Sequence, residues 1–191
     1  NSVGLQNPGV EKVISEELPK LKAVYNKKVI ANVGGFSIEE YQKCASLLDK
    51  EDQVIRPALL WNDGRTQEES DYLNEVIGKE TLSGYTANIS FAGFTASKIL
   101  WVKNKEPENF ARIEKIMLPK DYINYRLTGV HSCDYSDASG MLLLDVENKC
   151  WSKEMLDICG ISERQMPRLF ESYEKTGSLL PDVAAELGLT A

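Results

Sequence analysis

Short apolar runs and longer amphipathic stretches alternate along the chain, and glycine or proline residues separate most of them. Apolar residues recur at helical spacing from about residue 10 to 24, and the apolar run at residues 29–33 precedes Gly34 and Gly35. This pattern predicts a helix, a buried strand and a loop, followed by a helix from Ser37 to about residue 48. Such an order is typical of α/β proteins.

The remaining pattern also predicts alternating strands and helices. Strands are expected where apolar, β-favouring residues cluster, at residues 54–61, 115–118 and 141–146. Helices are expected at residues 66–77, 95–103, 119–127, 153–158 and 181–187, with a short helix after Pro107. Residues 81–90 and 134–140 are rich in small and polar side chains and are expected to form a loop and a turn.

Composition limits the classes of partner. The chain has 191 residues, of which 42% are hydrophobic and 27% charged, as in soluble globular proteins. Its net charge of −7 argues against nucleic acid or an anionic membrane as the partner, because both attract basic surfaces. No apolar run approaches the ~20 residues that a membrane-spanning helix needs. The charge does not exclude a phosphorylated substrate, which local lysines, arginines and helix N-termini can hold, and it does not determine the oligomeric state.

Cysteine and histidine usage argues against a metal site. The single histidine is His131, and no two cysteines stand in a CxxC pair, so we expect no structural zinc. Scattered free thiols suit a reducing compartment, and we expect a cytoplasmic protein. The sequence does not begin with methionine, which we interpret as truncation or processing.

Residues 1–9 form a motif with a known counterpart. The run Asn-Ser-Val-Gly-Leu-Gln-Asn-Pro-Gly resembles the Asn-x-x-Gly-Leu-x-Asn-Pro-Gly segment of class 1 dihydroorotate dehydrogenases. The resemblance continues through residues 17–19 and 30–34 and covers about residues 1–50. It implies a fragment of a β/α (TIM) barrel.

The same resemblance implies site residues and a cofactor. The loop would hold orotate or dihydroorotate, and Asn32 would face flavin mononucleotide (FMN) at the end of a barrel strand. The loop residues are Asn1, Ser2, Val3, Gly4 and Leu5. The alternative interpretation is that residues 1–9 form an ordinary turn and that Asn32 is an ordinary residue at the end of a strand. The family's cysteine-containing catalytic motif does not follow, and Cys44 has the spacing of a packed helix residue.

Residues 54–191 resemble a second family, through a series of motifs in order. The matching stretches are Arg-Pro-Ala-Leu-Leu-Trp-Asn-Asp-Gly-Arg at 56–65, Gly-Phe-Thr-Ala-Ser-Lys-Ile-Leu-Trp at 93–101, Leu-Pro-Lys-Asp-Tyr at 118–122, Arg-Leu-Thr-Gly at 126–129 and Ser-Asp-Ala-Ser-Gly at 136–140. They are similar to the N-terminal domain of FGGY-family carbohydrate kinases, closest to xylulokinases. Lys105 departs from the family's pattern after the second stretch.

This second resemblance implies an incomplete actin-like (ribonuclease H-like) domain and a sugar substrate. Xylulokinases convert D-xylulose and ATP to xylulose 5-phosphate with Mg²⁺. The resemblance implies that Trp61 forms an apolar wall beside the sugar and that Asp63 accepts hydrogen bonds from the sugar's hydroxyl groups. The alternatives are core packing for Trp61 and a helix cap for Asp63. Lys98, Trp101 and the pair Lys120-Asp121 are interpreted as structural, the pair as surface and cap residues.

The two resemblances meet at residues 47–54, which we call the seam. They predict two domains, residues 1–50 and residues 54–191, joined as a chimera. The kinase family's phosphate loop and catalytic aspartate have no counterpart in the sequence, so we assign no catalytic residue and no metal ligand and expect the chain alone to be inactive. Two alternatives stay open, which are a dehydrogenase fragment with FMN and a non-catalytic sugar-binding module.

Overall fold

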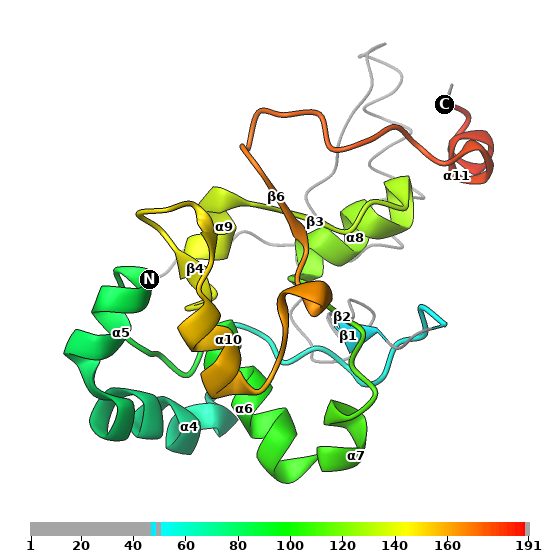
Figure 1. The fold of residues 1–191 in the computed structure, drawn as a ribbon. Helices are drawn as coiled ribbons and strands as arrows, with labels where there is room; N and C mark the ends of the chain where they lie inside the picture. The colour runs from blue at the N-terminus through cyan, green and yellow to red at the C-terminus, as the bar shows by residue number, and fades with distance from the viewer. Residues whose placement is uncertain (1–46, 49–50, 190–191) are drawn as a thin grey trace, which may run out of the picture. The chain divides into compact units, whose positions relative to one another are not determined.

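The computed structural model describes residues 47–48 and 51–189, all within a compact unit of residues 36–191 (Figure 1). Asn1, Ser2, Val3, Gly4, Leu5, Asn32 and Cys44, with the elements expected before residue 47, lie outside the described residues. The helix expected from Ser37 to about residue 48 is wrong at its end, because Leu47 and Leu48 form a strand. The described helices are η2 (Gly64–Thr66), α4 (Gln67–Asp71), η3 (Tyr72–Gly78), α5 (Lys79–Thr86), α6 (Thr95–Lys105), α7 (Pro107–Phe110), α8 (Pro119–Thr128), α9 (Tyr135–Ser139), α10 (Lys153–Cys159), η4 (Glu163–Gln165) and α11 (Pro181–Glu186). The described strands are β1 (Leu47–Leu48), β2 (Lys115–Ile116), β3 (Ser132–Asp134), β4 (Leu144–Asp145), β5 (Cys150–Trp151) and β6 (Arg168–Phe170).

A group of helices encloses the main core. Helix α6 packs against α4 and α10, and α5 packs against β4 (Figure 1). Leu73 and Leu82 are fully buried although they come from different parts of the helical run before α6. Ile99 and Met155 meet them in the same cluster, from α6 and α10. Burial of these apolar side chains is the main force that holds the helices together.

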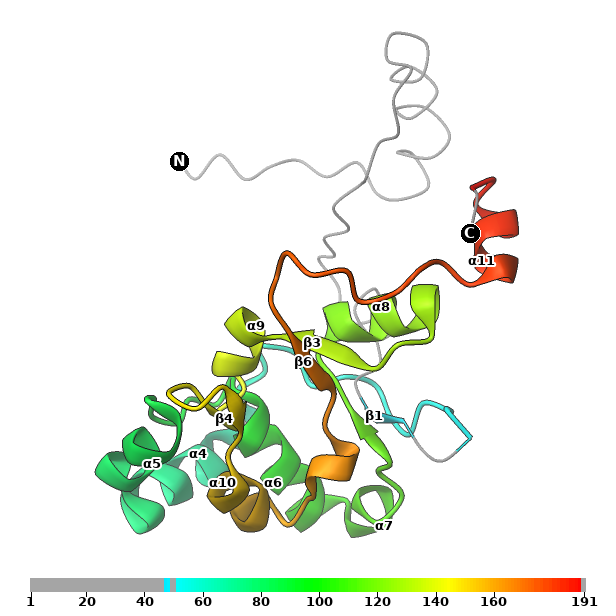
Figure 2. The ribbon, with the colours of Figure 1, turned by 45° about the horizontal axis from the view of Figure 1, so that its top comes forward.

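The described strands form three short pairs. β1 pairs with β2 and β4 with β5, both antiparallel, whereas β3 and β6 are parallel, with Cys133 opposite Leu169. Helix α8 contacts β3, and α9 contacts both β3 and β6 (Figure 2). Ile55 N–H donates to the carbonyl of Leu47 at 3.1 Å, so the chain doubles back at the seam. Farther along, the Trp61 carbonyl lies against Gly93, two residues before α6.

Several expected elements are confirmed with small shifts at their ends. α6 and α10 begin at the expected residues, and α8 begins at Pro119, where a missing N–H costs nothing. Gly129 ends α8 in the left-handed region, at φ 73°. Ser152 caps α10 by accepting a hydrogen bond from Met155 N–H. β2 occupies half of the strand expected at 115–118.

Three further sequence-based predictions are wrong. Of the loop expected at residues 81–90, residues 81–86 instead belong to α5, because Leu82 is buried and tertiary packing overrides the local polarity. Residues 135–139 form α9 and not a turn, because the Asp134 carboxylate accepts from Asp137 N–H and caps a helix there. Residues 55–61 belong to no strand, since Pro57 lacks an N–H to donate to a neighbour.

The expected strand at 141–146 is reduced to β4, because Leu142 has φ 59°, which breaks an extended run. Within the part of the chain that the structure describes, no helix has the length and apolar character needed to cross a membrane.

Candidate functional site

A cleft of about 540 Å³ lies between residues 56–61, the first turns of α6, and the segment that joins β2 to α8. Its walls are mainly apolar and include Pro57, Leu60, Phe94, Ile99 and Met117. The charged residues Arg56, Lys98, Lys120 and Asp137 also line it. A mainly apolar hollow with a few polar groups is the usual form of a small-molecule site.

Trp61 lies at this cleft with most of its side chain in solvent. The residue is 79% exposed, so the core-packing alternative for Trp61 is wrong. The backbone around it is held tightly, because a Cβ at Gly93 would lie 2.5 Å from the Trp61 carbonyl oxygen. The Thr66 hydroxyl donates to the Ala92 carbonyl at 2.7 Å and ties the turn after Trp61 to the same loop. The indole is therefore presented by a fixed backbone.

Asp63 caps the short helix that follows Trp61. Its carboxylate accepts from Arg65 N–H and from the Arg65 guanidinium, whose Nε lies 2.9 Å from Oδ2. Partial burial raises the pKa of Asp63, but the hydrogen bonds from Arg65 outweigh this and the net pKa is lowered. The capping alternative for Asp63 is confirmed, and its carboxylate stays ionised. Asp63 does not line the cleft itself.

Trp101 lies on α6 as a support for the residues around the cleft. It packs against the main core, as expected for a structural residue. The guanidinium groups of Arg56 and Arg65 lie 5.6 Å and 5.2 Å from its ring centroid, which is cation–π distance. Arg56 also pairs with Glu106, with Nε and Oε2 2.7 Å apart. These contacts hold Arg56 and Arg65 in place, one before and one after Trp61 in the chain.

Lys98 extends from α6 into the wall of the cleft. Its ammonium donates to the Gly93 carbonyl at 2.7 Å. Burial lowers the pKa of Lys98 to about 8, and the nearby carboxylate of Asp63 opposes this shift. Sequence reasoning assigned Lys98 a structural role and missed its place in the cleft. The position of Lys98 inside the 93–101 motif was the one sequence feature that could have indicated a role at the site.

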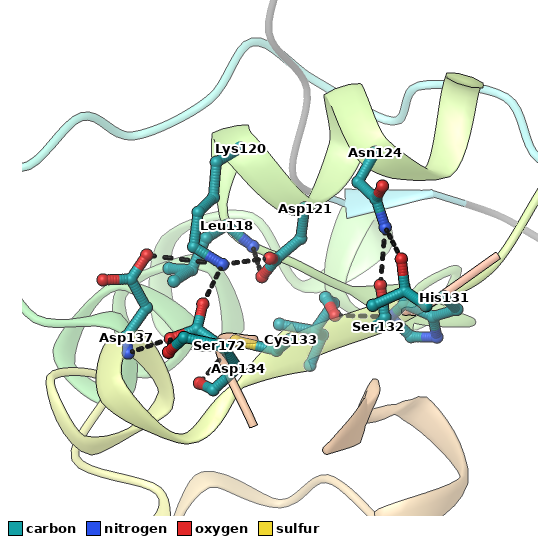
Figure 3. A network of polar contacts seen from close by, with 12 residues as sticks. Leu118, Lys120, Asp121, Asn124, His131, Ser132, Cys133, Asp134, Asp137 and Ser172 are labelled. Atoms are coloured by element: carbon teal, nitrogen blue, oxygen red, sulfur yellow. Dashed lines mark hydrogen bonds and ion pairs between the residues drawn. The ribbon is translucent and has the colours of Figure 1, made fainter. Parts of the chain in front are cut away.

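The opposite wall carries an ion network built around Lys120 (Figure 3). The Lys120 ammonium contacts the carboxylates of Asp121, Asp134 and Asp137. Burial lowers the pKa of Lys120, but hydrogen bonds to Asp121 and Asp134 raise it by more, so the ammonium stays charged. Asp121 also accepts from Leu118 N–H at 3.2 Å at the start of α8. Its cap role is confirmed, whereas its expected surface position is wrong because it is buried.

Histidine and cysteine side chains are scattered in the part of the chain that the structure describes. Among residues 47–48 and 51–189, no group of three or more His, Cys, Asp or Glu side chains is arranged to hold one. His131 bonds through Nε2 to the Ile116 carbonyl at 2.8 Å and lies outside the cleft. Cys133 and Cys159 are buried free thiols, and Cys150 is an exposed one.

Comparison with known proteins identifies the family. A model of the N-terminal domain of the FGGY family of carbohydrate kinases matches residues 9–191. The chain is 43% identical to xylulose kinase of Escherichia coli over 169 residues, which is 88% of this chain and 34% of that protein. It is 42% identical to xylulose kinase of Bacillus subtilis over 186 residues, 96% of this chain and 37% of that protein. The chain thus spans about a third of these relatives' length.

A solved structure shares the fold. A xylulose kinase structure from Brucella ovis, named "xyloylose kinase", has a TM-score of 0.72 and 45% identity, covering 76% of this chain and 30% of that one. The actin-like, α/β character expected for the kinase part is thereby confirmed. The family match begins at residue 9 and runs through most of the segment that resembles dihydroorotate dehydrogenase. The comparisons do not support a dehydrogenase fragment, a barrel fragment or FMN.

Proposed function

Because the chain belongs to the FGGY family of carbohydrate kinases, we propose that its described residues form part of the sugar site of a kinase acting on D-xylulose. The substrate is proposed from the identity of 42–43% to two xylulose kinases. The reaction would join the γ-phosphorus of ATP to a hydroxyl oxygen of the sugar. ADP would leave, and the hydroxyl proton would pass to a base.

The observation that carries this proposal is the exposed indole of Trp61 at the mouth of the cleft. An indole face stacks well on the C–H groups of a sugar, and an exposed ring that lines a mainly apolar cleft is available to a ligand there. The volume of about 540 Å³ lies within the usual range for small-molecule sites. The Asp137 carboxylate on the cleft wall provides an acceptor for hydroxyl groups.

Asp63 has a supporting role in this proposal. Its carboxylate holds Arg65 and caps the turn that follows Trp61, so it keeps the indole in place. The family implies ATP and Mg²⁺ as further reactants. Their contacts are proposed to come from outside the described residues.

The test is calorimetric titration of the 191-residue chain with D-xylulose. We expect saturable binding that Trp61→Ala weakens about tenfold or more, because aromatic contacts of this kind contribute on the order of 1 kcal/mol or more. The matched control is Tyr173→Ala, which removes an aromatic side chain that is 86% exposed and does not line the cleft. Equal loss of binding in both variants, or binding that Trp61→Ala leaves unchanged, would contradict the proposal.

A further inference from the structure

We propose that Lys98 is a substrate-positioning residue, whose ammonium donates hydrogen bonds to an oxygen of the sugar bound in the cleft. The inference rests on the proposed function and adds a residue and a chemical requirement to it. The ligand must present a carbonyl or hydroxyl oxygen as an acceptor to the α6 side of the cleft.

The hydrogen bonds of Lys98 leave donors for a ligand. A lysine ammonium has three N–H groups, and among the described residues Lys98 uses one of them, toward the Gly93 carbonyl. Within the same residues no carboxylate lies at ion-pair distance from it, in contrast to Lys120 on the facing wall, which contacts three. The free N–H groups of a half-buried ammonium at a cleft can donate to an acceptor that enters in place of water. The cleft that it lines is where such an acceptor would lie.

The same lysine is linked to the proposed stacking residue. Its ammonium holds the carbonyl of Gly93, and the Gly93 backbone lies directly against the carbonyl oxygen of Trp61. Movement of Lys98 toward a ligand would therefore be transmitted to the backbone that carries the indole. The sugar would then be held on one side by the Trp61 ring and oriented by the Lys98 ammonium.

The charged groups around Lys98 come from four segments. Asp63 and Arg65, in the turn before α4, are paired with each other, and Arg56 on the extended segment is paired with Glu106. On the facing wall, Lys120 of α8 contacts Asp137 of α9.

Among these groups only Lys98 changes its charge near neutral pH. The pKa of Asp63 is lowered and the pKa of Lys120 is raised, so neither of these two residues changes its charge there. Lys98, with a pKa of about 8, changes its charge in the accessible range.

The sign of the pH effect follows from the role of the ammonium. A donor role needs the protonated form, which is dominant below pH 8 and lost above it. Affinity for D-xylulose should therefore be highest at and below pH 7 and fall as the pH rises through about 8. The hydroxyls of the sugar do not titrate in this range. A lysine that only packs against α6 would give no such change in the affinity.

The experiment measures the dissociation constant for D-xylulose from pH 6 to 9.5 in the 191-residue chain and three variants. Lys98→Met should bind about tenfold more weakly, with an affinity that no longer depends on pH, because a hydrogen bond to a charged donor is lost. Lys98→Arg should restore part of the affinity and also remove the pH dependence, because arginine stays protonated. The matched control is Lys103→Met, on the same helix but outside the cleft lining, which should behave as the parent chain.

The outcomes separate the inference from the function on which it rests. If the parent chain binds D-xylulose and Lys98→Met binds as tightly with the same pH profile, the inference is overturned and the proposed function stands. If the parent chain and Lys103→Met both fail to bind D-xylulose at any pH while circular dichroism shows them folded, the proposed function fails and the inference falls with it.

Discussion

Gly93 shows how closely individual residues are fitted at the cleft. A methyl group there would meet the Trp61 carbonyl oxygen at 2.5 Å, which is closer than real Cβ atoms approach backbone. The sequence motif at 93–101 contains this glycine but does not reveal that it lies against Trp61, because the two residues are 32 positions apart. The sequence motifs therefore contain the residues of the cleft wall. The contact between Gly93 and Trp61, in contrast, is seen only in the folded structure.

We predict that Gly93→Ala lowers the free energy of unfolding by about 1–3 kcal/mol, the usual cost of overpacking. It should also weaken sugar binding, because relief of the clash moves Trp61. Urea denaturation gives the first quantity and calorimetric titration the second. The matched control is Gly84→Ala in α5, where a Cβ has open space and should stabilise the helix by about 0.5–1 kcal/mol. Equal stabilities for the two variants would contradict this view of the cleft.

At the scale of single elements, helix ends were the features that the sequence predicted best. Helix α8 begins at Pro119 and ends before Gly129, because each of these residues has a strong local preference for its position. The prediction failed where the deciding interaction was distant. Leu82 turns a polar stretch into helix α5 through burial, and no pattern within residues 81–90 contains that information.

Asp121 gives a test at this scale, since it caps α8 and also binds Lys120. Asp121→Ala should lower the free energy of unfolding by about 1–3 kcal/mol, because a buried cap and a charge partner are lost together. Asp182→Ala, at an exposed position in the first turn of α11, is the control and should change stability by about 0.5 kcal/mol or less. Thermal unfolding followed by circular dichroism measures both. A small effect of Asp121→Ala would show that the Lys120 network is redundant.

For the molecule as a whole, the kinase resemblance was predicted because many motifs occur in order over residues 54–191. The dehydrogenase resemblance rested on a few short motifs in the first fifty residues, and a family match that begins at residue 9 does not support it. Short runs of glycine, asparagine and proline recur in unrelated loops for the same backbone reasons. A plausible role for one loop is therefore weaker evidence for a family than several motifs that occur in the family's order over a long stretch.

The packing of the described unit can be tested through its thiols. Cys159 is buried in the core, and burial raises its pKa to about 12, while burial also raises the pKa of Cys133. Cys150 is exposed in β5. Among these three cysteines, we expect iodoacetamide to modify Cys150 first at pH 8 in the folded chain, and the other two only after unfolding. Peptide mass spectrometry locates the label. Early modification of Cys159 would contradict the core described here.

The central claim is that a sugar contacts Trp61 in the cleft, and the indole N–H signals in a ¹H–¹⁵N spectrum test it directly. The chain has three tryptophans, Trp61, Trp101 and Trp151. Titration with D-xylulose should shift the Trp61 signal in a saturable way. The Trp151 signal, whose Nε1 donates to the Pro167 carbonyl at 2.9 Å in the interior, should stay fixed. Saturating sugar that leaves the Trp61 signal unmoved would contradict the account.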